Sequence, residues 1–287
     1  MEEKKFPMGG CLPEEKDIRD YKLKAGAVFE AALPEEFVFG VNVPVKNQGA
    51  VNSCVAHAMS SILESHLGDV ESDDKTLSTN FIYGTQKLLH GHTGEGMYLR
   101  DACATALKYG DMVYDDCPGN IEVPDCYESA EEALNVPSKT EKAYHYRINR
   151  YFSCNSPAEI KYAIYNYGPV LAALNWSYSF YVDDEGILRT DDEKPEYCGG
   201  HAIMVIGWTK DGFLCQNSWG EDWGLNGKFI LPYTMSFTEA RGIEDYDNRL
   251  DEEDDPIKEP SLVATLKIVY MIINKILNFF KGRGQTK

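Results

Sequence analysis

One stretch of the chain, residues 43–67 (VPVKNQGAVNSCVAHAMSSILESHL), combines a polar turn, a single cysteine and an apolar helical pattern. Gln48, Gly49 and Asn52 precede Cys54 and suit a turn followed by a helix N-cap. After the cysteine, apolar side chains recur at helical spacing. The stretch therefore predicts a buried helix that carries the thiol of Cys54 in its first turn.

A thiol in this place can have either of two roles. Unpaired backbone N–H groups and the positive end of the helix dipole favour the thiolate form of Cys54. Taken alone, the segment favours an inert buried cysteine, which is the more frequent fate of a single cysteine. A reactive thiol needs a partner base, so the deciding residue must lie elsewhere in the chain.

Composition limits the other functions of the 287-residue chain. A formal net charge of −18 argues against nucleic acid as a partner, because phosphates require clustered Lys and Arg. The eight cysteines contain no CxxC pair, so we expect no metal and no cofactor. Cys117 and Cys126 flank one loop and leave a bridge or a metal site open, although two unpaired thiols are the expectation.

The pattern along the chain predicts an α+β protein of two lobes. Residues 1–36 are polar and carry several Pro and Gly, which indicates an extended N-terminal arm. Helical patterns dominate residues 37–135, and strand patterns dominate residues 136–235. The N-terminus has no apolar segment typical of a secretory signal peptide, so the expected location is the cytoplasm.

Two further segments follow the β-rich half. Residues 236–260 read as an acidic linker, since residues 244–259 contain nine acidic and two basic side chains. Residues 261–287 predict an amphipathic C-terminal helix. Lys267 and Lys275 interrupt its apolar run, so residues 261–281 favour docking on protein or on a membrane surface over spanning a membrane.

Among the six histidines, His201 has a distinct setting. It follows Gly199 and Gly200 and begins an apolar strand pattern, AIMVIGW, so its imidazole is expected at a strand end where backbone can approach closely. Sixteen residues later the chain continues with Asn217, inside QNSWGEDWGLNGKFI. His57 lies three residues after Cys54, but its neighbours fit a packed helix face.

These segments carry a resemblance to a known family. NQGxxxSC around Cys54, GGHA around His201 and NSWGxxWGxNG around Asn217 together resemble papain-like cysteine peptidases, in the order Cys, His, Asn. The similarity covers about residues 35–235. It implies a papain-like fold with a helical N-terminal lobe, a β-barrel-like C-terminal lobe and an active site in the cleft between them.

The resemblance also implies roles for individual residues in peptide-bond hydrolysis. Cys54 is the nucleophile, His201 is the base and later the acid, and Asn217 orients the imidazole. Gln48 donates a hydrogen bond to the oxyanion, and Trp219 covers the bond between histidine and asparagine. The thiolate and imidazolium are expected to form an ion pair across the cleft.

The substrate is expected to be a peptide or protein. By the same resemblance, Asn52, Gly96 and Gly200 pair with an extended peptide backbone, in a β-augmentation mode. Met97 falls near the pocket for the second side chain before the scissile bond, which indicates an apolar preference.

The chain departs from the family pattern beside the nucleophile. Val51 replaces a cysteine that usually forms a disulfide, and Val55 and His57 replace aromatic residues. The arm is short, which suggests a bacterial-like intracellular variant without a long propeptide, and either the arm or the C-terminal helix is a candidate to cover the cleft. A peptide-binding scaffold that has lost catalysis and a transpeptidase with the same thioester chemistry remain alternative functions.

Overall fold

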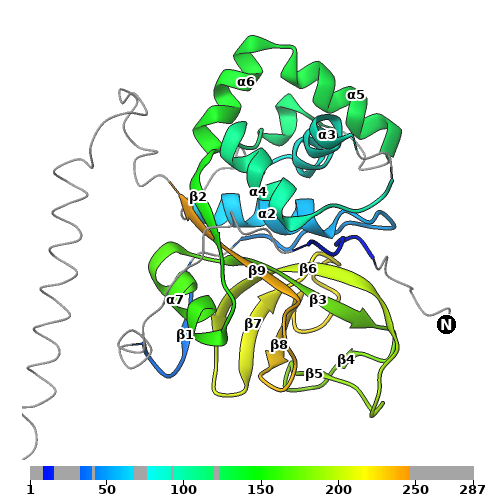
Figure 1. The fold of residues 1–287 in the computed structure, drawn as a ribbon, viewed down its shortest axis with the longest axis vertical. Coiled ribbons are helices and arrows are strands. Elements are labelled where there is room, and N and C mark those ends of the chain that lie inside the picture. Colours follow the sequence, from blue (N-terminus) through cyan, green and yellow to red (C-terminus); the bar gives the residue numbers. More distant parts are fainter. Residues whose placement is uncertain are drawn as a thin grey trace, which may run out of the picture. The chain divides into compact units, whose positions relative to one another are not determined.

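The computed structural model describes residues 9–15, 33–40, 43–67, 76–91, 94–118 and 123–245. All of these residues belong to one compact unit that ends at Asp245. Within this unit, a group of helices covers one side of an antiparallel sheet, and the segment 9–15 runs between the helices and the sheet (Figure 1). The predicted α+β class and the two-lobe arrangement are confirmed.

The helical lobe is built around helix α2, which begins at Cys54 as the sequence predicts. Ser78 caps α3 by accepting a hydrogen bond from the Phe81 N–H, which satisfies one of the free donors at a helix start. Helix α7 has the same type of cap, in which Ser156 accepts from the Glu159 N–H, and it packs beside the sheet. The helices are α2 (Cys54–His66), α3 (Thr79–His90), α4 (Leu99–Lys108), η2 (Tyr114–Asp116), α5 (Val123–Leu134), α6 (Pro137–Ala143), η3 (Tyr144–Tyr146) and α7 (Pro157–Tyr167).

The second lobe is a seven-stranded antiparallel sheet with the order β2-β9-β3-β6-β7-β8, in which β1 also pairs with β6. The first and last strands of this order do not pair with each other among the described residues, so the sheet is open rather than a closed barrel. The strands are β1 (Phe37–Val38), β2 (Ile148–Ser153), β3 (Val170–Ser177), β6 (Tyr197–Trp208), β7 (Gly212–Gln216), β8 (Lys228–Pro232) and β9 (Glu239–Asp245), with β4 (Tyr181–Val182) and β5 (Leu188–Arg189) in a separate hairpin.

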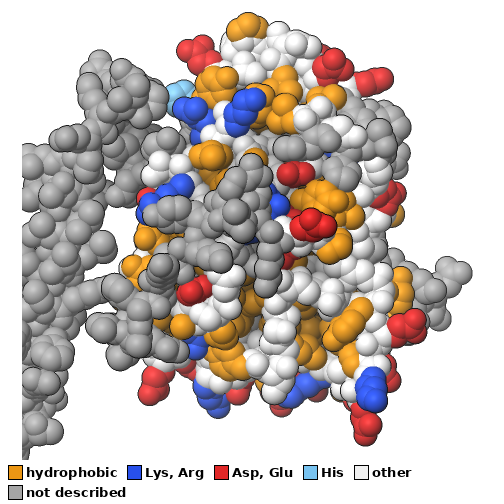
Figure 2. Space-filling model, in the orientation of Figure 1, with side chains coloured by type: hydrophobic (Ala, Val, Ile, Leu, Met, Phe, Trp, Pro, Cys, Tyr) orange, Lys and Arg blue, Asp and Glu red, His pale blue; other side chains and the backbone are white. Residues whose placement is uncertain are grey.

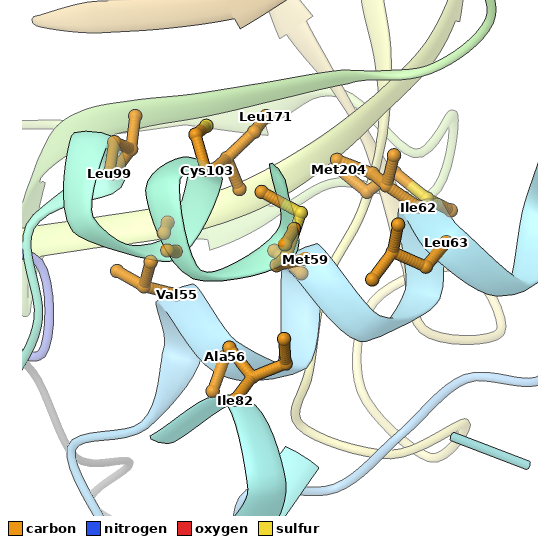
Figure 3. Close-up of a cluster of buried hydrophobic side chains, with 14 of the residues drawn as sticks. Val55, Ala56, Met59, Ile62, Leu63, Ile82, Leu99, Cys103, Leu171 and Met204 are labelled. Carbon is orange, nitrogen blue, oxygen red and sulfur yellow. The ribbon is translucent and has the colours of Figure 1, made fainter. Parts of the chain in front are cut away.

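Helix α2 is fully embedded between the two lobes. Met59 and Ile62 are inaccessible to solvent, and they share a core cluster with Leu171 of β3 and Met204 of β6 (Figure 3). Burial of such a side chain stabilises the fold by roughly 1.5–3 kcal/mol. The helix is thus fixed from both sides, and Cys54 at its first position is fixed with it.

The acidic side chains are spread over the visible face of the molecule rather than gathered in one place (Figure 2). Several are paired on the surface, such as Glu244 with Arg150 at 2.6 Å. This distribution agrees with a general solubilising role for the negative charge.

The structure corrects several sequence-based boundaries. Residues 239–245, which the sequence analysis assigned to the acidic linker, form β9, whose inner positions are buried between β2 and β3. Its sequence, EARGIED, does not predict a buried strand, because charged residues interrupt the apolar pattern. Phe37 and Val38 belong to the sheet rather than to the helical lobe. Residues 137–146 are helical, although the sequence assigned them to the β-rich lobe.

Other expectations fall outside the described residues. These are most of the arm, the remainder of the acidic linker and the C-terminal helix of residues 261–287. In the part of the chain that the structure describes, no helix has the length and apolar character needed to cross a membrane.

Asp111 is a buried carboxyl in the helical lobe, and it generates a prediction on pH and stability. It accepts hydrogen bonds from Ser60 Oγ at 2.7 Å and from the Met112 N–H at 2.7 Å. Burial raises the pKa of Asp111 to about 8, so the fold favours the protonated form. The contribution of this group to stability is therefore full at acidic pH and declines as the pH rises towards 8.

We expect Asp111→Asn to flatten this dependence, because an amide has the same shape and does not ionise. Melting temperatures measured from pH 5 to pH 9 should fall less steeply for the variant than for the wild type. The exposed Asp115→Asn is the matched control and should follow the wild type. Parallel curves for all three proteins would contradict the prediction.

Candidate active site

Cys54 occupies the first position of α2 and is completely buried. Its Sγ accepts a hydrogen bond from the Ala202 N–H at 3.4 Å, so the sulfur touches the backbone of β6 immediately after His201. The fold thus brings together two residues that are far apart in the sequence. The thiol lies where the helix start meets the sheet.

His201 and Asn217 are directly bonded. The His201 Nε2 lies 2.8 Å from the Asn217 Oδ1, and Asn217 follows immediately after β7. The strands β6 and β7 are neighbours in the sheet, which sets this distance. The other ring nitrogen, Nδ1, is buried and makes no hydrogen bond with any described residue.

Aromatic side chains enclose the bonded pair. Trp219 stacks on the His201 ring with a centroid separation of 4.6 Å. Trp176 of β3 meets the same imidazole edge-on at 5.2 Å and also contacts Trp219 at 4.9 Å. These rings exclude water from the hydrogen bond and hold the plane of the imidazole.

Burial controls the charge of the thiol and imidazole in this conformation. It raises the pKa of Cys54 to about 11, although the hydrogen bond from Ala202 opposes the shift. It lowers the pKa of His201 to about 4, against the effect of Asn217. Both groups are therefore neutral at pH 7 here, whereas the sequence analysis expected an ion pair.

Gln48 lies in the turn before α2 and is 3% exposed. Its side chain is tethered at both ends: Nε2 donates to the Val51 carbonyl at 2.8 Å, and Oε1 accepts from Ser218 Oγ at 2.6 Å. The Gln48 backbone N–H also donates to the Ser218 carbonyl at 2.9 Å. Because Ser218 follows Asn217, these two hydrogen bonds link the turn of the helical lobe to the loop that carries Asn217. The amide of Gln48 is thus held in a fixed orientation.

Residues 9–15 of the N-terminal arm lie in the cleft. The Cys11 N–H donates to the Gly200 carbonyl at 3.0 Å, the Leu12 N–H donates to the Met97 carbonyl at 2.9 Å, and the Met97 N–H donates to the Gly10 carbonyl at 2.9 Å. The arm therefore bridges both lobes as an added extended segment. It explains the burial of the thiol, because Gly10 packs on the sulfur so closely that a Cβ there would approach Cys54 Sγ to 2.8 Å.

The sequence-predicted peptide-binding residues all contact this segment. A Cβ on Gly96 would lie 3.1 Å from the Gly10 carbonyl oxygen, and one on Gly200 would lie 2.3 Å from the Cys11 oxygen. The backbone of Asn52 lies against Gly10, while its side-chain amide binds Glu95. Glycine at positions 96 and 200 is thus needed for a backbone to approach this closely.

The Gly10 carbonyl is held on the helical-lobe side of the cleft, where it accepts a hydrogen bond from the Met97 N–H at 2.9 Å. The Gln48 Nε2 donates to the Val51 carbonyl. The arm thus covers the thiol of Cys54 while its backbone is bonded to Met97 and Gly200.

Glu14 anchors the far end of the described arm. Its carboxylate is 3% exposed and pairs with Arg241 Nη2 at 2.6 Å and Arg100 Nη2 at 3.2 Å. The Glu14 N–H donates to Glu239 Oε1 at 3.1 Å. Because Arg241 comes from β9 and Arg100 from α4, this cluster joins the two lobes beside the cleft.

Sequence reasoning missed these arm and arginine residues. The sequence analysis considered the arm as a possible cover of the cleft but named none of its contacts. The one local clue is Gly9–Gly10, where small residues permit close approach to the sulfur. Arg100 and Arg241 carry no motif, and only the pairing of β9 with β3 brings Arg241 to the cleft.

The structure shows the surroundings of His57, which departs from the family pattern, and of the cysteines. His57 is buried on α2, with Nδ1 bonded to the Ser53 carbonyl at 3.0 Å, so it is a packed structural histidine. Among the described residues, Cys117 is unbridged. The side chain of Cys126 lies outside the described residues. No group of three His, Cys, Asp or Glu side chains that could hold a metal is found within the described ranges.

Substitution of Gly10 tests the arm's position. A methyl group in Gly10→Ala would meet the sulfur of Cys54 and the backbone of Asn52, so the arm should be displaced from the cleft. We expect alkylation of Cys54 by iodoacetamide to become about fivefold faster or more, since overpacking of this kind costs roughly 1–3 kcal/mol. Labelling is followed by mass spectrometry of the Cys54 peptide.

Gly40→Ala is the matched control, because a Cβ there meets no atom within 4 Å. It should label at the wild-type rate. An unchanged rate for Gly10→Ala, in a protein that melts as the wild type does, would contradict the position of the arm.

Comparison with known proteins identifies a family. The model of the papain family cysteine proteases matches residues 39–245. A solved structure of xylellain, a cysteine protease from Xylella fastidiosa, superposes with a TM-score of 0.71 over 84% of this chain and 97% of the other, at 22% identity. Procathepsin B from Trypanosoma congolense superposes with a TM-score of 0.61 over 83% of this chain and 87% of the other, at 17% identity. These two likenesses concern the fold.

Curated relatives share parts of the sequence. An uncharacterized peptidase C1-like protein of Acanthamoeba polyphaga mimivirus is 28% identical over 65% of this chain and 63% of its own length. A gut-specific cysteine proteinase of Caenorhabditis elegans is 35% identical over 40% of this chain and 35% of its own length. The chain thus spans less than two thirds of the curated relatives that it matches.

Proposed function

The chain belongs to the papain family of cysteine proteases, and from this premise we propose that it hydrolyses peptide bonds through an acyl-enzyme mechanism with Cys54, His201 and Asn217. The observation that carries the proposal is the junction of α2 with β6. There the Cys54 sulfur contacts the backbone next to His201, whose imidazole is bonded to Asn217. A nucleophile, a base and an orienting group on three elements match the chemical requirement for thiol catalysis.

The steps follow from the hydrogen-bond roles. When the cleft is open to water, the His201 Nδ1 takes the thiol proton and the sulfur of Cys54 attacks the substrate carbonyl. The C–N bond then breaks, and the imidazolium gives its proton to the leaving amine. Water, activated by the same imidazole, hydrolyses the thioester and restores the thiol. Asn217 keeps Nδ1 directed to the sulfur by holding Nε2 at 2.8 Å.

The side chain of Gln48 stabilises the oxyanion by donating a hydrogen bond to it. Its amide is held by Val51 and Ser218, so a second N–H of Nε2 is available in a fixed orientation near the start of α2. Together with the Cys54 backbone N–H, it donates to the negative oxygen of the tetrahedral intermediate. The rigid tether supports this role because a preoriented donor needs no rearrangement during the reaction.

The conformation with the arm in the cleft is a resting state of this enzyme. Gly10 covers the sulfur, and the backbone bonds of Gly200 and Met97 are already used. A substrate must therefore displace residues 9–15 before it can bind. Opening restores water around the thiol and imidazole, which reverses the desolvation that keeps both neutral.

The direct test is a peptide-cleavage profile. The Gly10→Ala protein is incubated with a mixed peptide library and the products are read by mass spectrometry, beside the Cys54→Ala form of the same variant. We expect cleavage that is lost with Cys54→Ala and retained in a matched Cys103→Ala control, since Cys103 is a buried thiol of α4 remote from His201 in sequence. Binding of peptides without products would instead support a scaffold function.

Gln48→Ala provides a second test. Loss of an oxyanion donor should lower kcat by about 100- to 1000-fold with a smaller effect on KM, because the bond forms fully only in the transition state. Steady-state kinetics on a fluorogenic peptide measure both constants, and a melting curve controls for folding. A kcat within about twofold of the parent would exclude Gln48 from this role.

A further inference from the structure

The carboxylate of Glu14 lies in a buried binding site, named the seat, which is formed by Arg241, Arg100 and Ser153. Arg241 is 6% exposed at its side chain and donates Nη1 to Ser153 Oγ, so β2 and β9 fix its position. Arg100 contributes its Nη2 and also its backbone N–H, which Glu14 Oε1 accepts. Three donors converge on one carboxylate from two lobes, which is a geometry suited to charge-assisted binding.

The charge of this seat favours an anion. Two guanidinium groups face the Glu14 carboxylate, and the acidic Glu239 lies beside them, with its Oε2 3.6 Å from Arg241 Nη2. The planar fork of N–H donors on a guanidinium matches the two oxygens of a carboxylate. An acidic side chain is therefore the ligand whose chemistry can replace Glu14 at this site.

The seat is continuous with the peptide-binding cleft. The arm reaches it two residues after Leu12, whose N–H is bonded to Met97. The resemblance to papain-like peptidases places Met97 near the pocket for the second side chain before the scissile bond, so we infer that the seat lies on the acyl side of Cys54. A peptide that replaces the arm passes the seat within a few residues of the bond to be cleaved.

We propose that Arg241 and Arg100 form a specificity site for an acidic side chain of the peptide substrate, and that Glu14 of the arm occupies this site in the resting state. The inference rests on the proposed peptidase function and adds its substrate class, peptides with Glu or Asp on the acyl side. The seat then binds two ligands in turn. Glu14 of the arm binds there while the cleft is covered, and an acidic side chain of the substrate competes with Glu14 for the same arginines.

A binding experiment tests the seat without requiring catalysis. The full chain with Cys54→Ala and Glu14→Gln is titrated with a fluorescent peptide of residues 9–15, GGCLPEE, and with the same peptide carrying Gln in place of its first Glu. Under reducing conditions at low salt, we expect the Glu peptide to bind about tenfold more tightly, because it alone makes charge-assisted bonds. Equal affinities would overturn the proposal.

A kinetic experiment tests substrate choice. The full chain with Glu14→Gln is given fluorogenic peptides in which Glu or Gln stands second, third or fourth before the scissile bond. At one position we expect kcat/KM for Glu to exceed that for Gln by about tenfold, with the ratio falling at high salt. Arg100→Gln should bring the ratio close to one, since it removes one of the two guanidinium groups.

Arg150→Gln is the matched control, because Arg150 pairs with Glu244 elsewhere on the sheet and should leave the ratio unchanged. Cys54-dependent cleavage with no preference for Glu at any position would overturn the specificity site and leave the peptidase intact. Absence of all cleavage would instead count against the proposed function, and the binding experiment would then decide on the seat alone.

Discussion

The contact between the start of α2 and strand β6 is the constraint on which the rest of the structure depends. The hydrogen bond from Ala202 to the Cys54 sulfur joins the two lobes at the point where the thiol meets the histidine strand. The apolar face of α2 is buried against β3 and β6 behind this contact, so the helix cannot shift without opening the core. The positions of Cys54 and His201 are therefore fixed by the packing of α2 against the sheet.

The N-terminal arm lies at the same junction of α2 and β6, where it covers the thiol of Cys54. Its backbone adds to the cleft between Gly200 and Met97, and Glu14 fastens it by charge at the arginine seat. Backbone pairing alone is independent of side chains, whereas the carboxylate contact is specific. Under the proposed function, a peptide substrate of suitable charge replaces these contacts, which links the resting state to the choice of substrate.

Much of the fold could be predicted from local pattern. The starts of α2 at Cys54 and of α3 after its cap Ser78, and strand β3 after Gly168, follow apolar periodicity and caps that act within a few residues. His201 was expected at a strand end, but β6 begins at Tyr197, so the histidine lies within the strand. Strand β9 was missed because Glu239, Arg241 and Glu244 interrupt its apolar pattern. Arg241 pairs with Glu14 and Glu244 pairs with Arg150, and both partners come from distant segments. The open sheet likewise differs from the expected barrel, since closure depends on which strands meet at the edges.

The sequence by itself determined the α+β class, the family and the identity of the three candidate catalytic residues, because motif residues and short-range periodicity are local properties of the chain. Only the tertiary structure decided that the thiol is covered by Gly10, that both titrating groups are neutral in this state and that two arginines meet beside the cleft. These features arise from burial and from contacts between residues up to 227 positions apart, as for Glu14 and Arg241. A local sequence pattern cannot predict contacts between residues so far apart in the chain. The covering of Cys54 at the start of α2 therefore depends on how the two lobes and the arm pack together.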